Sequence, residues 1–141
     1  SIAVLVSVLM VSCGKGPVTE YMAKLDPIIE LSAKGANAYA TVDLQDPEAG
    51  VGILQNEVIP AYEEYLAKLN ALTDTIKDEK LKQAHAILVG AAQGQLRGYQ
   101  VMLTGLAEGD IETLQEGEAI LVEATKSTAQ FQDAINALLK K

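Results

Sequence analysis

Residues 106–114, LAEGDIETL, contain the clearest turn in this chain and decide how its second half folds. Gly109 can adopt the left-handed conformation that ends a helix, and the side chain of Asp110 can cap the helix that follows. Apolar residues recur at steps of three and four on both sides of this turn. The pattern predicts two long amphipathic helices, over residues 81–106 and 114–138, joined by a tight connection.

The same spacing continues toward the N-terminus and predicts two more helices, over residues 18–42 and 51–72. The stretch VDLQDPEAG separates them. Within it, Asp46 can cap the second helix, and Pro47 suits the first turn because its missing N–H is not needed there. Four amphipathic segments with short connections are typical of a helical bundle.

Two prolines fall inside the first two predicted helices. Pro27 and Pro60 each remove a backbone donor and place a ring against the preceding turn, so we expect a kink at each. The third helix can be capped by either Asp74 or Asp78. The complete prediction is an all-α domain over residues 17–141, folded as an antiparallel up-down-up-down four-helix bundle.

Composition agrees with this fold class and excludes some functions. The chain has 141 residues, of which 49% are hydrophobic and 4% aromatic, so we expect one core of mainly small and aliphatic side chains. Its 11 Lys and Arg against 19 Asp and Glu give a net charge of -8, which disfavours binding to nucleic acid and binding to anionic lipid headgroups through a basic patch. The single cysteine cannot form an internal disulfide.

That cysteine, Cys13, follows an apolar run over residues 2–11. The run is about half the ~20 residues of a membrane-spanning helix and matches the core of a signal peptide. Ser12, Val11 and Met10 precede the cysteine, with Met10 standing where leucine is usual. This stretch resembles the lipobox of bacterial lipoproteins. The alternatives are a buried core cysteine and an ordinary signal peptide with an incidental cysteine.

The resemblance implies that Cys13 is the first residue of the mature protein and carries a covalent lipid, with no other cofactor expected. Residues 1–12 would then be the remnant of a signal peptide with a truncated start, and residues 13–16 the anchor and a short linker. In Gram-negative lipoproteins, an aspartate directly after the lipidated cysteine often retains the protein in the inner membrane. Gly14 stands at this position here, so the resemblance favours the periplasmic side of the outer membrane in such a host. In a Gram-positive host it implies the outer face of the cell membrane.

A row of glycines is the most unusual feature of the third predicted helix. Gly90, Gly94 and Gly98 follow one another at four-residue spacing, and each costs about 1 kcal/mol relative to alanine inside a helix. They could open a groove for a ligand or a partner helix. Close packing of a neighbouring helix within the bundle is the preferred interpretation.

The only histidine, His85, is the one candidate cofactor ligand. It could hold a non-covalent haem together with a methionine such as Met22 or Met102. A polar position in the seam between helices is the preferred interpretation. No metal site is predicted.

The acidic residues of the fourth predicted helix, such as Glu112 and Glu116, suit a solvated face, and no catalytic constellation can be assembled. We therefore predict a lipid-anchored envelope protein that is not an enzyme and acts as a structural or protein-interaction module. Its partners would be the membrane and another envelope protein. The alternative is a lipid-anchored bundle that binds a small molecule or haem.

Overall fold

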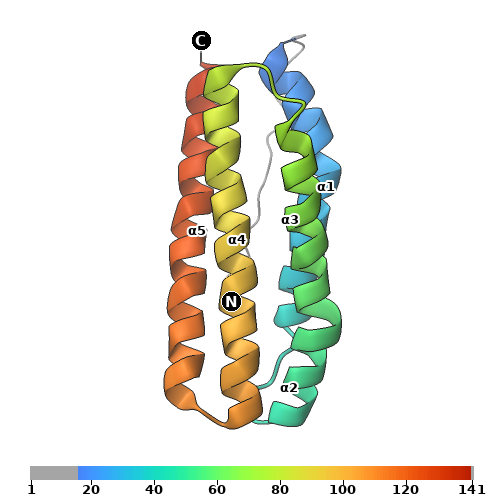
Figure 1. Cartoon of the computed structure of the whole chain (residues 1–141), viewed down its shortest axis with the longest axis vertical. Helices are drawn as coiled ribbons and strands as arrows, with labels where there is room; N and C mark the ends of the chain where they lie inside the picture. The colour runs from blue at the N-terminus through green and yellow to red at the C-terminus, as the bar shows by residue number, and fades with distance from the viewer. Residues whose placement is uncertain (1–15, 141) are drawn as a thin grey trace.

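The computed structural model describes residues 16–140, and every regular element in this part of the chain is a helix (Figure 1). The predicted all-α fold with four long helical segments is confirmed. The second segment is composite, because a π-helical turn joins two α-helices. In chain order the elements are α1 (Pro17–Tyr39), α2 (Pro47–Ile53), η1 (Leu54–Val58), α3 (Ile59–Thr73), α4 (Glu79–Glu108) and α5 (Ile111–Leu139).

Three helices, α2, α4 and α5, begin after aspartates that the sequence predicts as caps. The side chains of Asp46, Asp78 and Asp110 each accept a hydrogen bond from a backbone N–H two or three residues further on. Asp78 therefore caps α4, whereas Asp74 lies at the C-terminal end of α3. Gly109 has a φ of 68° and ends α4 in the left-handed conformation.

The two prolines occupy different settings. α1 continues through Pro27 as one helix, and Pro60 lies in the first turn of α3, directly after the π-helical turn. The N–H of Ile59 donates to the carbonyl of Leu54, five residues back, so this turn is wider than an α-helical turn. In a regular α-helix the ring of Pro60 would clash with the carbonyl group four residues earlier, and the wider turn relieves this clash.

Aromatic side chains are few, but they lie inside. Tyr62 is almost completely buried, and the centre of its ring lies 4.9 Å from that of Tyr99. Tyr39 adds a third ring, 5.0 Å from Tyr99. Burial raises the pKa of Tyr62 to about 12, so this hydroxyl stays protonated at neutral pH. The core is therefore more aromatic than the composition suggests.

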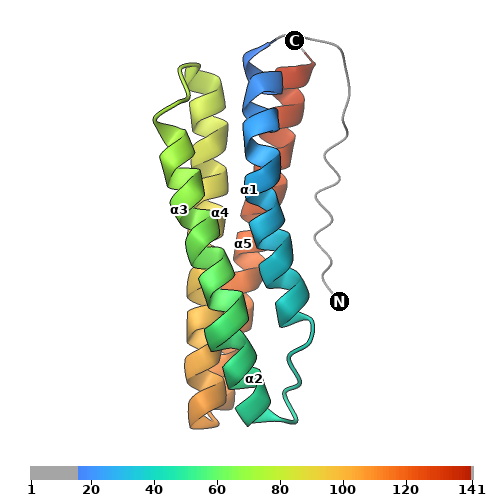
Figure 2. The ribbon, with the colours of Figure 1, turned by 90° about the vertical axis from the view of Figure 1, so that its right-hand side faces the viewer.

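The longest interface joins α4 and α5, while α1 packs on α3 and α3 on α4 (Figure 2). α1 makes only limited contact with α5. None of the helices among the described residues is both long and apolar enough to cross a membrane.

The molecule is elongated and has two distinct ends (Figures 1 and 2). We call one the proximal end, formed by residues 16–24, 74–82 and 133–140. The other is the distal end, formed by residues 40–57 and 100–118, which include α2 and the turn between α4 and α5. The described chain therefore starts at the proximal end.

Candidate functional site

The predicted lipidation residue, Cys13, and the predicted signal segment, residues 1–12, lie outside the described residues. The description starts at Gly16, at the proximal end, and α1 begins at the next residue. Whatever precedes Gly16 in the mature protein is therefore joined to this end of the bundle.

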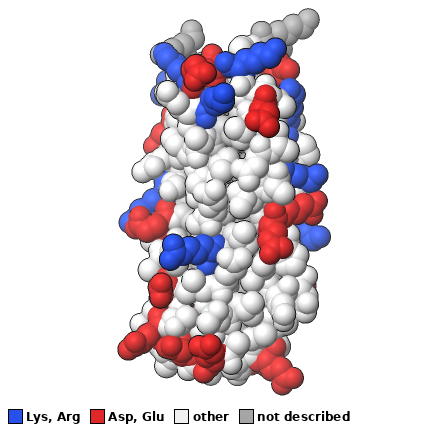
Figure 3. Space-filling model, viewed as in Figure 1, with Lys and Arg blue, Asp and Glu red and all other residues white. Residues whose placement is uncertain are grey.

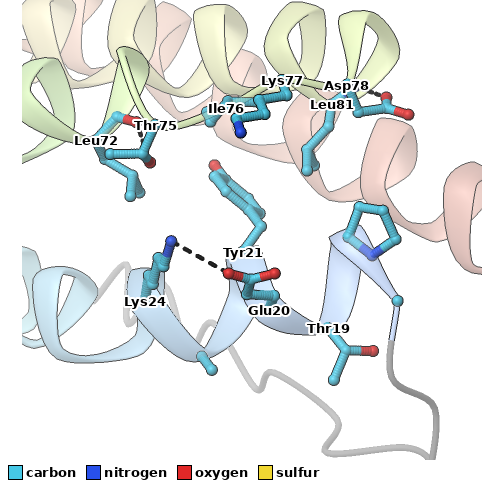
Figure 4. Close-up of a pocket in the computed structure, with 13 residues that line it drawn as sticks. Thr19, Glu20, Tyr21, Lys24, Leu72, Thr75, Ile76, Lys77, Asp78 and Leu81 are labelled. Carbon is cyan, nitrogen blue, oxygen red and sulfur yellow. Dashed lines mark hydrogen bonds and ion pairs between the residues drawn. The ribbon is translucent and has the colours of Figure 1, made fainter.

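A groove opens at the same end (Figure 4). It has a volume of about 910 Å³ and lies between the first turns of α1 and the connection from α3 to α4. Apolar side chains of Tyr21, Ile76 and Leu81 line it together with the cations of Lys24 and Lys77. The carboxylates of Glu20 and Asp78 also line the groove, so its two cations are matched by two acidic groups.

The charged residues on one side of the groove are paired. Lys24 Nζ lies 3.4 Å from a carboxylate oxygen of Glu20, one helical turn earlier on α1. Figure 4 shows Lys77 on the opposite side, on the connection that leads into α4. Both members of the Lys24–Glu20 pair are largely exposed, so their attraction is screened by water and salt.

Tyr21 links the groove to the only histidine of the chain. Its hydroxyl lies 2.8 Å from Nδ1 of His85, which is completely buried. The other ring nitrogen, Nε2, lies 2.9 Å from the carbonyl oxygen of Leu69 and 3.0 Å from the hydroxyl of Thr73. All of these bonds are satisfied when Nε2 carries the proton and Tyr21 donates to Nδ1.

This geometry leaves neither ring nitrogen of His85 free to bind iron. Met102 cannot act as the second ligand with it, because the two residues lie 17 positions apart on α4, or about 25 Å along the axis. Among the described residues, no group of three or more acidic, histidine or cysteine side chains could hold a metal ion. His85 instead joins α1, α3 and α4 through hydrogen bonds.

The burial of His85 predicts a pH-dependent stability. Burial lowers its pKa from 6.5, and the hydrogen bond to the carbonyl of Leu69 opposes part of this shift. The unfolded chain therefore binds this proton more readily than the folded protein. The free energy of unfolding is fully retained above pH 6.5 and falls as the pH drops from 6.5 toward the lowered pKa.

Because the chain has one histidine, its ring resonance in a proton NMR titration measures this pKa directly. Urea denaturation above and below pH 6.5 measures the accompanying loss of stability. A titration midpoint at or above 6.5 would contradict the prediction.

The structure places the three predicted glycines in different surroundings. Gly90 is exposed, and an added Cβ would have no neighbour within 4 Å. An added Cβ would lie 3.2 Å from Cβ of Ala124 at Gly94, and 2.8 Å from the side chain of Leu121 at Gly98. Four residues turn an α-helix by about 40° more than a full turn, so the row winds from the surface into the α4–α5 interface.

Sequence reasoning missed a second pattern of small residues, which recurs every seven positions on α4 and α5. Ala91, Gly98 and Gly105 recur every seven residues on α4, and Gly117 and Ala124 do so on α5. All five are buried. A seven-residue repeat keeps residues on one face of a packed helix, whereas a four-residue repeat does not. We call these five residues the small-residue seam, and the seven-residue spacing is the signal that could have found it.

Charge is distributed unevenly between the two ends. At the distal end, residues 40–57 and 100–118 contain no Lys or Arg, and Figure 3 shows acidic side chains gathered there on one face. The acidic residues of these stretches are Asp43, Asp46, Glu48, Glu57, Glu108, Asp110, Glu112, Glu116 and Glu118. The proximal end is balanced, with Lys24, Lys77, Lys80, Lys82 and Lys140 against Glu20, Asp74, Asp78, Glu79 and Asp133.

Comparison of the chain with protein-family models, with curated proteins and with solved structures finds no match.

Proposed function

We propose that this chain is a lipid-anchored protein of the bacterial envelope that acts as a structural or protein-interaction module. The observation that carries the proposal is the order Leu-Met-Val-Ser-Cys at residues 9–13, which places a cysteine at the end of an apolar run. Several acyl chains on Cys13 would hold the protein firmly, since each buried methylene contributes about 0.8 kcal/mol.

The position of the bundle supports this attachment. Only residues 14–16 separate Cys13 from the start of α1. Such a short link keeps the folded body next to the surface to which the lipid is bound. A rigid body held at a membrane suits a structural or interaction role.

We also propose the finer topology expected from the sequence, an antiparallel up-down-up-down order of the four helical segments. The short connections, residues 40–46, 74–78 and 109–110, support it, because short links join helices that are neighbours in space. Kinks at Pro27 and Pro60 stay predictions.

The hydrogen bonding of buried polar atoms favours the interaction role over the ligand-binding alternative. Among residues 16–140, every buried side-chain nitrogen and oxygen already has a hydrogen-bond partner within the protein. A ligand in the bundle interior would have to displace such contacts, those of His85 included. The outer surface is thus the part of this protein best suited to contact other molecules.

Metabolic labelling with a fatty-acid probe in the host cells tests the anchor. We expect the wild-type protein to take up the label and to sediment with membranes. Cys13→Ser should abolish both, because serine offers no thiol for the thioether bond. Ser12→Ala is the matched control, since alanine is also accepted before a lipidated cysteine, and it should label like wild type.

The proposal is wrong if the wild-type protein and Cys13→Ser are equally unlabelled and equally absent from the membrane fraction. Circular dichroism of both proteins verifies that the bundle itself is unchanged. The substitution leaves residues 16–140 unchanged, so we expect the same helical content in both proteins.

A further inference from the structure

We propose that the proximal end of the bundle faces a bilayer that contains anionic phospholipids, so that the bundle stands with its acidic distal end pointing away from the bilayer. This inference rests on the proposed lipid anchor at Cys13. It adds which surface of the protein meets the membrane and the chemistry of that contact. Three features of the described residues carry it.

The first feature is the reach of the link. Three residues span at most about 10 Å from Cys13 to Gly16. Gly16 and the first turn of α1 lie at the proximal end, beside the connection between α3 and α4 (Figures 1 and 4). A lipid inserted in the bilayer therefore holds this end within about 10 Å of the surface.

The second feature is the uneven charge. All charged residues in the two distal stretches are acidic, whereas five lysines balance five carboxylates at the proximal end. Surface charges act over a Debye length of about 8 to 10 Å at physiological salt. The 30 residues of α4 extend about 45 Å, so an upright bundle keeps the acidic end far outside this range. A bundle lying flat would bring many of its carboxylates against an anionic surface.

The third feature is the chemistry of the groove. Its lining places the carboxylates of Glu20 and Asp78 beside the ammonium groups of Lys24 and Lys77, so the charges of the groove balance. Lysine side chains at a membrane interface can lay their stems on apolar surface and direct their charge to phosphate groups. Lys80, Lys82 and Lys140 lie at the same end and balance Asp74, Glu79 and Asp133, so this end has no net charge that would repel an anionic bilayer.

Two matched single-cysteine variants test the orientation. Ala137→Cys and Ala107→Cys each replace an exposed alanine near the C-terminal end of a helix, the first at the proximal end and the second at the distal end. Lipidation consumes the thiol of Cys13, so the new cysteine is the only site for a fluorescent label.

The lipidated variants are placed in phosphatidylglycerol-containing vesicles that carry a nitroxide quencher on the lipid headgroups. We expect at least fivefold stronger quenching for the label at position 137 than for the label at position 107, because about 40 Å separates them along the helices. Equal quenching of the two labels in membrane-bound protein overturns the orientation but leaves lipidation standing. Protein that carries no lipid and fails to sediment with the vesicles overturns both proposals.

A charge-matched pair of triple variants tests the docking chemistry. Lys77→Gln, Lys80→Gln and Lys82→Gln together should bring the quenching ratio close to one. Removing three cations further from the membrane, by Lys34→Gln, Arg97→Gln and Lys126→Gln, should leave the ratio near that of the wild-type background. Equal effects of the two triple variants overturn the role of the proximal lysines.

Discussion

Gly117→Ala is expected to lower the free energy of unfolding by about 3 kcal/mol, the upper part of the usual range for overpacking. A Cβ at this position would lie 2.9 Å from the carbonyl oxygen of Gly98 and 2.9 Å from the backbone nitrogen of Met102. Both are backbone atoms of α4, so no side-chain rotation relieves the contact. The two helices must separate, and the seam between them loosens along its length.

Gly90→Ala is the matched control, because it makes the same change within a helix where nothing lies near the added carbon. It should raise the free energy of unfolding by about 1 kcal/mol through the higher helix propensity of alanine. Gly94→Ala should fall between the two, since its new contact is with a side-chain carbon at 3.2 Å. Urea denaturation followed by circular dichroism measures all three. Equal stability of Gly117→Ala and Gly90→Ala would contradict the packing argument.

His85→Ala is expected to cost about 4 kcal/mol, which is a large part of the stability of a small domain. The substitution leaves a cavity in the core and removes the hydrogen-bond partner of the buried Tyr21 hydroxyl. It also removes one of the bonds to the carbonyl of Leu69. Buried polar groups that lose their partners add to the cost of the cavity.

Two further variants separate the components of this loss. Tyr21→Phe deletes one hydroxyl without opening a large cavity and should cost about 1 to 2 kcal/mol. Lys82→Ala changes an exposed residue of the same helix and should shift the stability by less than about 0.5 kcal/mol. If His85→Ala unfolds at the same urea concentration as Lys82→Ala, the histidine does not hold the three helices together.

Much of the fold could be predicted because local chemistry decides it. A helix must satisfy its first N–H groups, and Asp46, Asp78 and Asp110 do so from within their own segments. Gly109 likewise acts through its own backbone conformation. Buried positions such as Leu69 and Phe131 also follow from helical periodicity alone.

Features that join distant segments could not be predicted in the same way. The groove lies between the first turns of α1 and residues 72–81, which only tertiary packing brings together. The partners of His85 likewise come from α1 and α3, so its spacing on α4 gave no sign that both ring nitrogens would be occupied. The π-helical turn before Pro60 is a local adjustment that an apolar period of 3.6 does not reveal.

The close fit of α4 and α5 also has a kinetic consequence. Their interface is the longest in the molecule, yet only residues 109–110 separate the two helices along the chain. Contacts between segments close in sequence cost little loop entropy to form, and low contact order is associated with folding in microseconds to milliseconds. The C-terminal hairpin can thus assemble before the N-terminal half docks onto it, which makes it a natural nucleus for the whole bundle.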